Sequence, residues 1–152
     1  MSQTYIGIGS NVGEPRENVE RAIKELSRIG KVRAQSSLYR TAPWGNTGQP
    51  PFINAVVDLE TDLPPHALLE SLKDLEREFG RNPRAPLWGP RVIDLDILTY
   101  DDIEVQEPHL TIPHARLHDR AFVLVPLSEL DDRFADSCEA LSSHDLSGVT
   151  KV

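Results

Sequence analysis

Two aspartates stand two positions apart in an apolar run of the sequence, WGPRVIDLDIL at residues 88–98. Side chains alternate between the faces of a β-strand, so Asp94 and Asp96 are expected on one face and Leu95 on the other, toward the core. Same-face neighbours lie roughly 7 Å apart at the backbone, close enough for both carboxylates to reach one divalent cation or two. Without a cation, carboxylates 4 Å apart would repel by about 4 kcal/mol at an effective dielectric of 20. The pair is therefore either a solvated strand face or a magnesium site.

Arginines close to the pair favour the magnesium site. Arg91 precedes Asp94 by three positions, and Arg81 and Arg84 stand in the loop-like segment before it. Magnesium bound by one or two carboxylates usually completes its coordination with substrate phosphates, and guanidinium groups bind phosphate oxygens in pairs. The combination predicts phosphoryl transfer. The sequence has no Walker A loop, and GIGSNVG at residues 7–13 lacks the third glycine of a dinucleotide fingerprint because Val12 occupies its position.

Composition narrows the class of protein. The chain has 152 residues, a formal net charge of −8 and a single cysteine, Cys138. One cysteine excludes an internal disulfide framework, and the acidic balance argues against a basic surface for nucleic acid. Because no run of about 18 apolar residues and no signal-like N-terminus occurs, no membrane partner is expected. We expect a cytoplasmic monomer with one domain over residues 1–152, its core at about 4–130 and a tail at 131–152.

The elements that must position the acidic pair follow from periodicity. Alternating and β-rich segments predict strands, and apolar residues at helical spacing, bounded by proline and glycine, predict two helices. The strands are expected at residues 4–11, 31–40, 52–61 and 92–100, and the helices at 15–29 and 64–80. This order predicts an α+β, ferredoxin-like (split βαβ) antiparallel sheet with both helices on one face. Residues 120–130 are expected to form a buried helix or strand, followed by one weak helix and a terminal strand.

Five segments in succession then resemble one known family. They read YIGIGSNVG, SLYRTAPWG, PFINAVV, WGPRVIDLDIL and LTIPHARLHDRAFVL. From residue 5 to residue 130, the chain resembles the 6-hydroxymethyl-7,8-dihydropterin pyrophosphokinases of folate biosynthesis. The resemblance implies a ferredoxin-like fold and transfer of the β,γ-diphosphoryl group of ATP to the pterin hydroxymethyl oxygen, with release of AMP. It implies ATP as co-substrate and two Mg²⁺ ions as cofactors.

The same resemblance assigns roles to individual residues. It implies that Asp94 and Asp96 bind the two magnesium ions and that Arg81 and Arg91 join them in catalysis by stabilising the phosphates. The implied ATP-binding residues are Glu76, Arg84, Trp88, Arg91, Ile97, Thr111, His114 and Arg120. The implied pterin-binding residues are Gly9, Thr41, Ala42, Trp44, Phe52, Asn54 and Phe122. Phe52 and Phe122 would sandwich the pterin ring, and Glu76 would pair with an arginine or contact the nucleotide.

Three nucleotide-side positions depart from part of the family, and two other functions stay open. Pro83 and His109 stand where some members have arginine, and Ala115 stands where tyrosine can occur. A ferredoxin-like domain could instead bind a nucleotide as a sensor without turnover, because this fold hosts many functions. The third hypothesis is a nucleotidyltransferase, although Ser10 and Asp94 lie far apart in the sequence and the corresponding elements of polymerase-β-type enzymes lie close together.

Overall fold

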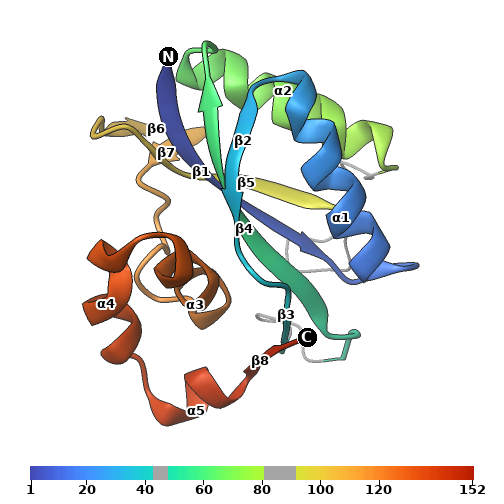
Figure 1. Cartoon of the computed structure of the whole chain (residues 1–152), viewed down its shortest axis with the longest axis vertical. Helices are drawn as coiled ribbons and strands as arrows, with labels where there is room; N and C mark the ends of the chain where they lie inside the picture. Colours follow the sequence, from blue (N-terminus) through green and yellow to red (C-terminus); the bar gives the residue numbers. More distant parts are fainter. Residues whose placement is uncertain (43–47, 81–91) are drawn as a thin grey trace.

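The computed structural model describes residues 1–42, 48–80 and 92–152 (Figure 1). Its centre is a six-stranded sheet in the order β5-β1-β4-β3-β8, in which β2 also pairs with β4. The strands are β1 (Ser2–Ser10), β2 (Lys31–Gln35), β3 (Tyr39–Thr41), β4 (Phe52–Thr61), β5 (Asp94–Tyr100) and β8 (Val149–Lys151). Every pairing described in this sheet is antiparallel. Because β4 lies between β1 and β2, the first two strands form the predicted split βαβ unit.

Two amphipathic helices cover one face of the sheet. They are α1 (Pro15–Glu25), which continues into the 3-10 turn η1 (Leu26–Arg28), and α2 (Pro65–Glu78). Both have proline in the first helical turn, where its missing N–H costs nothing. Their buried residues pack with the inward side chains of the sheet, such as Ile6, Leu59 and Leu95, in one core. The predicted α+β arrangement, with both helices on one face, is confirmed.

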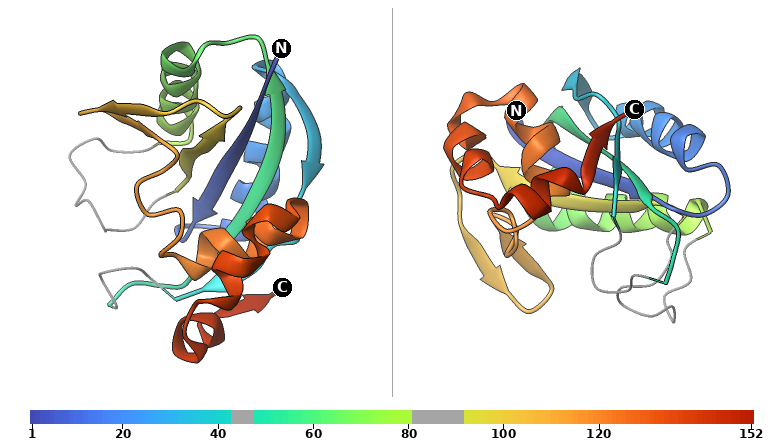
Figure 2. Two further views of the ribbon diagram at one scale, coloured as in Figure 1. Left: turned by 90° about the vertical axis from the view of Figure 1, so that its left-hand side faces the viewer. Right: turned by 90° about the horizontal axis from the view of Figure 1, so that it is seen from below.

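The opposite face of the sheet carries a second, smaller core. The helix α3 (Ala121–Leu130) packs Leu124 and Leu127 against Tyr5, Val56 and Leu98 of the sheet. After it come the 3-10 turn η2 (Asp132–Phe134) and the short helices α4 (Ala135–Glu139) and α5 (Ser143–Ser147). Figures 1 and 2 show these helices gathered at one end of the sheet, away from α1 and α2. Residues 120–130 were expected to form a helix or a strand. The structure has a helix there, which begins at Ala121.

Two expectations from the sequence require correction, and one hairpin was not predicted. The single strand expected at 31–40 is two strands, because Ser36 interrupts the ladder and its hydroxyl accepts the Val56 N–H at 2.9 Å. The tail contains two short helices in place of one, and its terminal strand is β8. A separate hairpin, β6 (Val105–Glu107) and β7 (Leu110–Ile112), was not predicted. No helix among the described ranges is long and apolar enough to cross a membrane.

Candidate active site

Two glycines of β1 form the floor of the site, between the residues that β4 and β5 contribute. Gly9 of β1 pairs with Asn54 on β4 and with Asp94 on β5, and Gly7 pairs with Asp96. Neighbouring strands lie about 4.8 Å apart, so the row from Asn54 to Asp94 spans about 10 Å. A Cβ at Gly9 would lie 3.3 Å from the Asn54 Oδ1 atom. Without side chains at Gly7 and Gly9, the backbone of β1 itself can be approached between the amide and the carboxylates.

A cavity of about 500 Å³ opens above this floor. Every predicted site residue that the structure describes lines it: Gly9, Thr41, Ala42, Phe52, Asn54, Glu76, Asp94, Asp96, Ile97, Thr111, His114, Arg120 and Phe122. His109 and Ala115, two of the positions that depart from part of the family, line it as well. The remaining predicted residues, Trp44, Arg81, Arg84, Trp88 and Arg91, lie outside the described residues, as does Pro83. Segments far apart in the sequence, from Gly7 to Val123, thus meet at one site large enough for a small-molecule ligand.

The acidic pair has the orientation that alternation predicts. Leu95 and Ile97 are buried in the core beneath the sheet, and Asp94 and Asp96 are half-buried at the cavity. The side chain of Ile97 packs in the core, and the residue also lines the cavity. No cluster of three or more histidine, cysteine or acidic side chains that could hold a metal occurs in the described part of the chain. Two adjacent carboxylates beside an open cavity nevertheless fit magnesium, which is commonly held by one or two carboxylates with substrate phosphates.

Glu76 supports the strand that carries the pair. Its side chain is buried on α2, and its Oε2 atom accepts the Leu95 backbone N–H at 2.8 Å. Leu95 lies between the two aspartates on β5, the edge strand of the sheet. A carboxylate that satisfies a buried edge N–H fixes the backbone on which both aspartates stand. The expected contact of Glu76 with the nucleotide or an arginine stays a prediction. The hydrogen bond from the Leu95 N–H is a further contact, which the sequence did not predict.

Basic side chains line the same cavity as the aspartates. Arg120 is buried, and its guanidinium carbon lies 5.3 Å from the centre of the Phe122 ring. Burial lowers the pKa of Arg120, while the charge of Asp96 acts in the opposite direction. Burial and then the positive charge of Arg120 lower the pKa of His114. His114 Nδ1 accepts the Arg116 backbone N–H at 3.1 Å, as a neutral imidazole can. Positive and negative groups therefore face the same space, a pattern suited to a polyanion with bound cations.

The other end of the cavity is aromatic and amide-bearing. Asn54 and Thr41 are buried, and the Thr41 hydroxyl donates to Asn54 Oδ1 at 3.5 Å. Phe52 and Phe122, both half-buried, come from β4 and α3 and line the same cavity. Flat apolar rings together with an amide that has both donor and acceptor atoms suit a planar heterocycle.

Some residues that line the cavity were not among the predicted site residues. Gly7, Lys73 and Arg116 are examples. Gly7 could have been found from its spacing of two from Gly9, which places both glycines on one strand face. Lys73 has no comparable signal, because its position on the helix is an ordinary exposed one and only the packing of α2 against β5 brings it to the cavity.

The fold and the site together define a ferredoxin-like α+β protein whose cavity joins a flat apolar end to an acidic and cationic end. A family model described as 7,8-dihydro-6-hydroxymethylpterin-pyrophosphokinase (HPPK) matches residues 5–132. The chain belongs to this family.

Individual relatives agree with the family assignment. A 2-amino-4-hydroxy-6-hydroxymethyldihydropteridine pyrophosphokinase of Methylorubrum extorquens is 41% identical, over 100% of this chain and 99% of the relative. The enzyme of that name from Haemophilus influenzae is 42% identical, over 86% of this chain and 82% of the relative. Among solved structures, an HPPK-DHPS in complex with substrates has a TM-score of 0.70 at 14% identity, covering 91% of this chain and 43% of that one. The chain therefore spans less than half of that longer structure, and the likeness at this identity concerns the fold.

Proposed function

We propose that this protein transfers the β,γ-diphosphoryl group of ATP to the hydroxymethyl oxygen of 6-hydroxymethyl-7,8-dihydropterin and releases AMP, a step of folate biosynthesis. The observation that carries the proposal is the row across the sheet in which Gly9 separates Asn54 from Asp94. A pterin at the amide end would present its substituent toward the aspartates, where the phosphates of ATP would lie. Holding both reactants in line supplies much of the rate enhancement of such a transfer.

The acidic end would hold two magnesium ions, with Asp94 and Asp96 as their protein ligands. Bound magnesium would supply charge neutralisation on the attacking and leaving oxygens of the in-line displacement. Arg120, with Arg81 and Arg91, would bind the phosphate oxygens, and His114 would donate a hydrogen bond from its second ring nitrogen. The main chains of Ile97 and Thr111 would contact the adenine, and Arg84 and Trp88 would contact the nucleotide.

The amide end would orient the pterin. Phe52 and Phe122 would stack on the two faces of the ring, and Asn54 would pair with its edge together with Thr41 and backbone groups of residues 42–44. Since Asn54 is buried, its amide would be held in one orientation, which favours a matching donor and acceptor pattern over an unrelated flat ring.

Product analysis tests the proposal. The purified protein with ATP, magnesium and the hydroxymethyl-dihydropterin is expected to form AMP and the pterin diphosphate in equal amounts, separable by chromatography. Release of inorganic diphosphate would indicate a nucleotidyltransferase. Nucleotide binding without magnesium and without AMP formation would indicate a sensor, and either result would overturn the proposal.

A further inference from the structure

The strand β8 lies beside a short strand that reaches the cavity. β3 has only three residues, Tyr39–Thr41, and lies between β4 and β8 (Figure 1). Thr41 pairs with Phe52 on one side and with Val149 on the other. Thr41 and the next residue, Ala42, both line the cavity. Whatever holds β3 in place therefore also holds part of the wall of the site.

Backbone hydrogen bonds at both ends of this pairing join β8 to the wall. The Ala42 N–H donates to the Gly148 carbonyl at 3.1 Å, and the Val152 N–H donates to the Leu38 carbonyl at 2.9 Å. In an antiparallel ladder the hydrogen-bonded pairs alternate, which makes Arg40 and Thr150 the bonded pair between them. The amides of Arg40 and Ala42, on either side of Thr41, are thus directed at β8.

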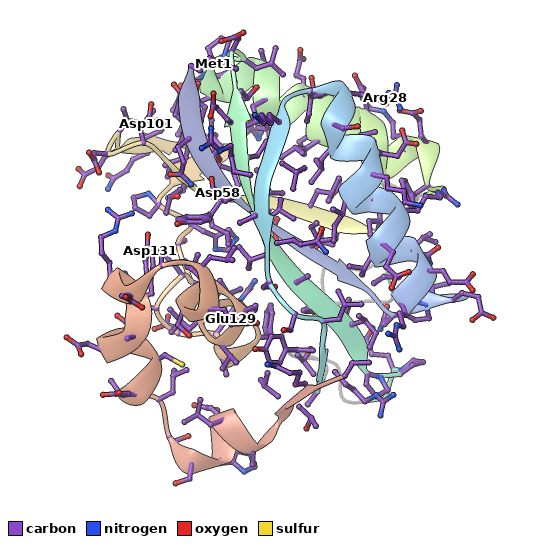
Figure 3. All side chains as sticks on the ribbon, viewed as in Figure 1. Met1, Arg28, Asp58, Asp101, Glu129 and Asp131 are labelled. Atoms are coloured by element: carbon purple, nitrogen blue, oxygen red, sulfur yellow. The ribbon has the colours of Figure 1, made fainter. Side chains whose placement is uncertain are left out.

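The helix α3 fixes the beginning of the same segment. The Tyr39 hydroxyl donates to Glu129 Oε1 at 2.6 Å, and the Ser37 N–H donates to the same atom at 3.0 Å. Figure 3 labels Glu129 on α3, beside the sheet. Burial acts to raise the pKa of Glu129, but the hydrogen bonds from Tyr39 and Ser37 and the charge of Lys151 together lower it. One end of β3 is therefore anchored to α3 by side chains, while the end at the cavity is held by main-chain pairing with β4 and β8 and by the long Thr41–Asn54 hydrogen bond.

We infer that β8 is a positioning element for the pterin end of the site, which acts through Thr41 and Ala42 without touching the substrate. The family match ends at residue 132, so this support comes from a part of the chain that the family description does not include. The nucleotide end of the cavity is built from α2, β5 and the segment after β7, and β8 does not pair with any of them. Loss of β8 pairing should therefore weaken pterin binding and leave nucleotide binding unchanged. The assignment of the cavity end at Thr41 and Ala42 to the pterin rests on the proposed function.

The test compares Thr150→Pro with Thr150→Ala. Proline removes the backbone N–H that pairs with Arg40, while alanine keeps it. The side chain at position 150 is exposed, so neither substitution disturbs the core. We expect Thr150→Pro to raise the KM for the pterin about five- to tenfold. The affinity for a non-hydrolysable ATP analogue with magnesium, measured by calorimetry, should stay at the wild-type value, and Thr150→Ala should match the wild type in both.

Amide hydrogen exchange provides a readout that does not need the pterin. Exchange at Arg40 and Ala42 should accelerate in Thr150→Pro and stay unchanged in Thr150→Ala. Equal pterin KM values in the two variants would overturn the inference, as would a parallel loss of both ligands, which would indicate general destabilisation. If the wild type makes no AMP, the proposed function fails. Unchanged exchange at the two amides would by itself refute the positioning by β8.

Discussion

Glu76 is a buried carboxylate that accepts the backbone N–H of Leu95, between the two aspartates. Glu76→Ala would leave the Leu95 N–H without its acceptor, which costs about 1–3 kcal/mol of unfolding free energy for a buried group. Glu76→Gln keeps an acceptor oxygen in the same place. We expect urea unfolding to show the large loss for alanine and at most about half of that loss for glutamine.

The same pair of variants separates support of the strand from direct contact with a ligand. If Glu76 acts through β5, the affinity for magnesium and the ATP analogue should fall in Glu76→Ala and largely recover in Glu76→Gln. A glutamine variant that unfolds as easily as the alanine variant would contradict the hydrogen-bond argument.

The titration of His114 is expected to make the unfolding free energy depend on pH, and the direction follows from its lowered pKa. Burial and the charge of Arg120 lower its pKa from the ordinary value of 6.5, and Asp94 opposes this in part. Below 6.5 the unfolded chain therefore binds the proton first, so the contribution of His114 to stability is complete above 6.5 and is lost as the pH falls through the folded pKa. The unfolding free energy of the wild type should decrease between about pH 7 and about pH 5.

The control for this titration is His114→Gln, which keeps a polar group but cannot titrate. Its unfolding free energy should fall less over the same pH window, because the other histidines are common to both proteins. Identical pH profiles for the two proteins, measured by chemical denaturation, would show that His114 titrates normally in the folded state.

At the scale of the elements, substitutions of the two β1 glycines test their role as the floor of the site. Gly9→Ala places a Cβ 3.3 Å from Asn54 Oδ1, and Gly7→Ala places one 3.4 Å from the Leu98 side chain, an ordinary van der Waals distance. Because the contact with Asn54 is tighter than an ordinary van der Waals contact and the contact with Leu98 is not, only Gly9→Ala should displace a group that would bind the pterin. We expect about a tenfold loss of pterin affinity in Gly9→Ala, equivalent to one hydrogen bond. The affinity should change less in Gly7→Ala, and an equal loss in both would contradict this account.

Elements with a strong local period could be predicted from the sequence. The two helices have apolar stripes between proline and glycine, and the strand after residue 92 alternates two carboxylates with buried leucine and isoleucine. The strand face predicted for Asp94 and Asp96 is therefore the observed one. All of the predicted site residues within the described ranges line one cavity. Several of those residues were assigned through the family resemblance, because a phenylalanine such as Phe52 has no local signal for ligand binding.

Features made by contacts between distant segments could not be predicted. The break after Gln35 depends on the Ser36 hydroxyl meeting Val56, and the role of β8 depends on pairing with β3 from the other end of the chain. Glu76 looks like an ordinary helical residue until α2 packs beside the edge strand. No periodicity within one segment reports the partner of a sheet edge or of a buried carboxylate.

At the scale of the whole molecule, an acidic chain surrounds a site with local positive charge. The net charge is −8, yet Arg116 and Arg120 line the cavity. Guanidinium groups at the cavity of an acidic chain favour a polyanionic ligand there, which suits a nucleotide carrying bound cations. The account therefore depends on the two carboxylates of β5 as the protein's ligands for those cations.

Magnesium-dependent AMP formation by Asp94→Asn and Asp96→Asn tests this claim most directly. Asp58→Asn is the matched control, since Asp58 lies on the same sheet face outside the cavity and accepts a hydrogen bond from Gln3 (Figure 3). With ATP and the hydroxymethyl-dihydropterin, each active-site variant should lose kcat/KM by about 100-fold or more at every magnesium concentration, and Asp58→Asn should keep wild-type turnover. Turnover by either active-site variant at the level of Asp58→Asn would contradict the account.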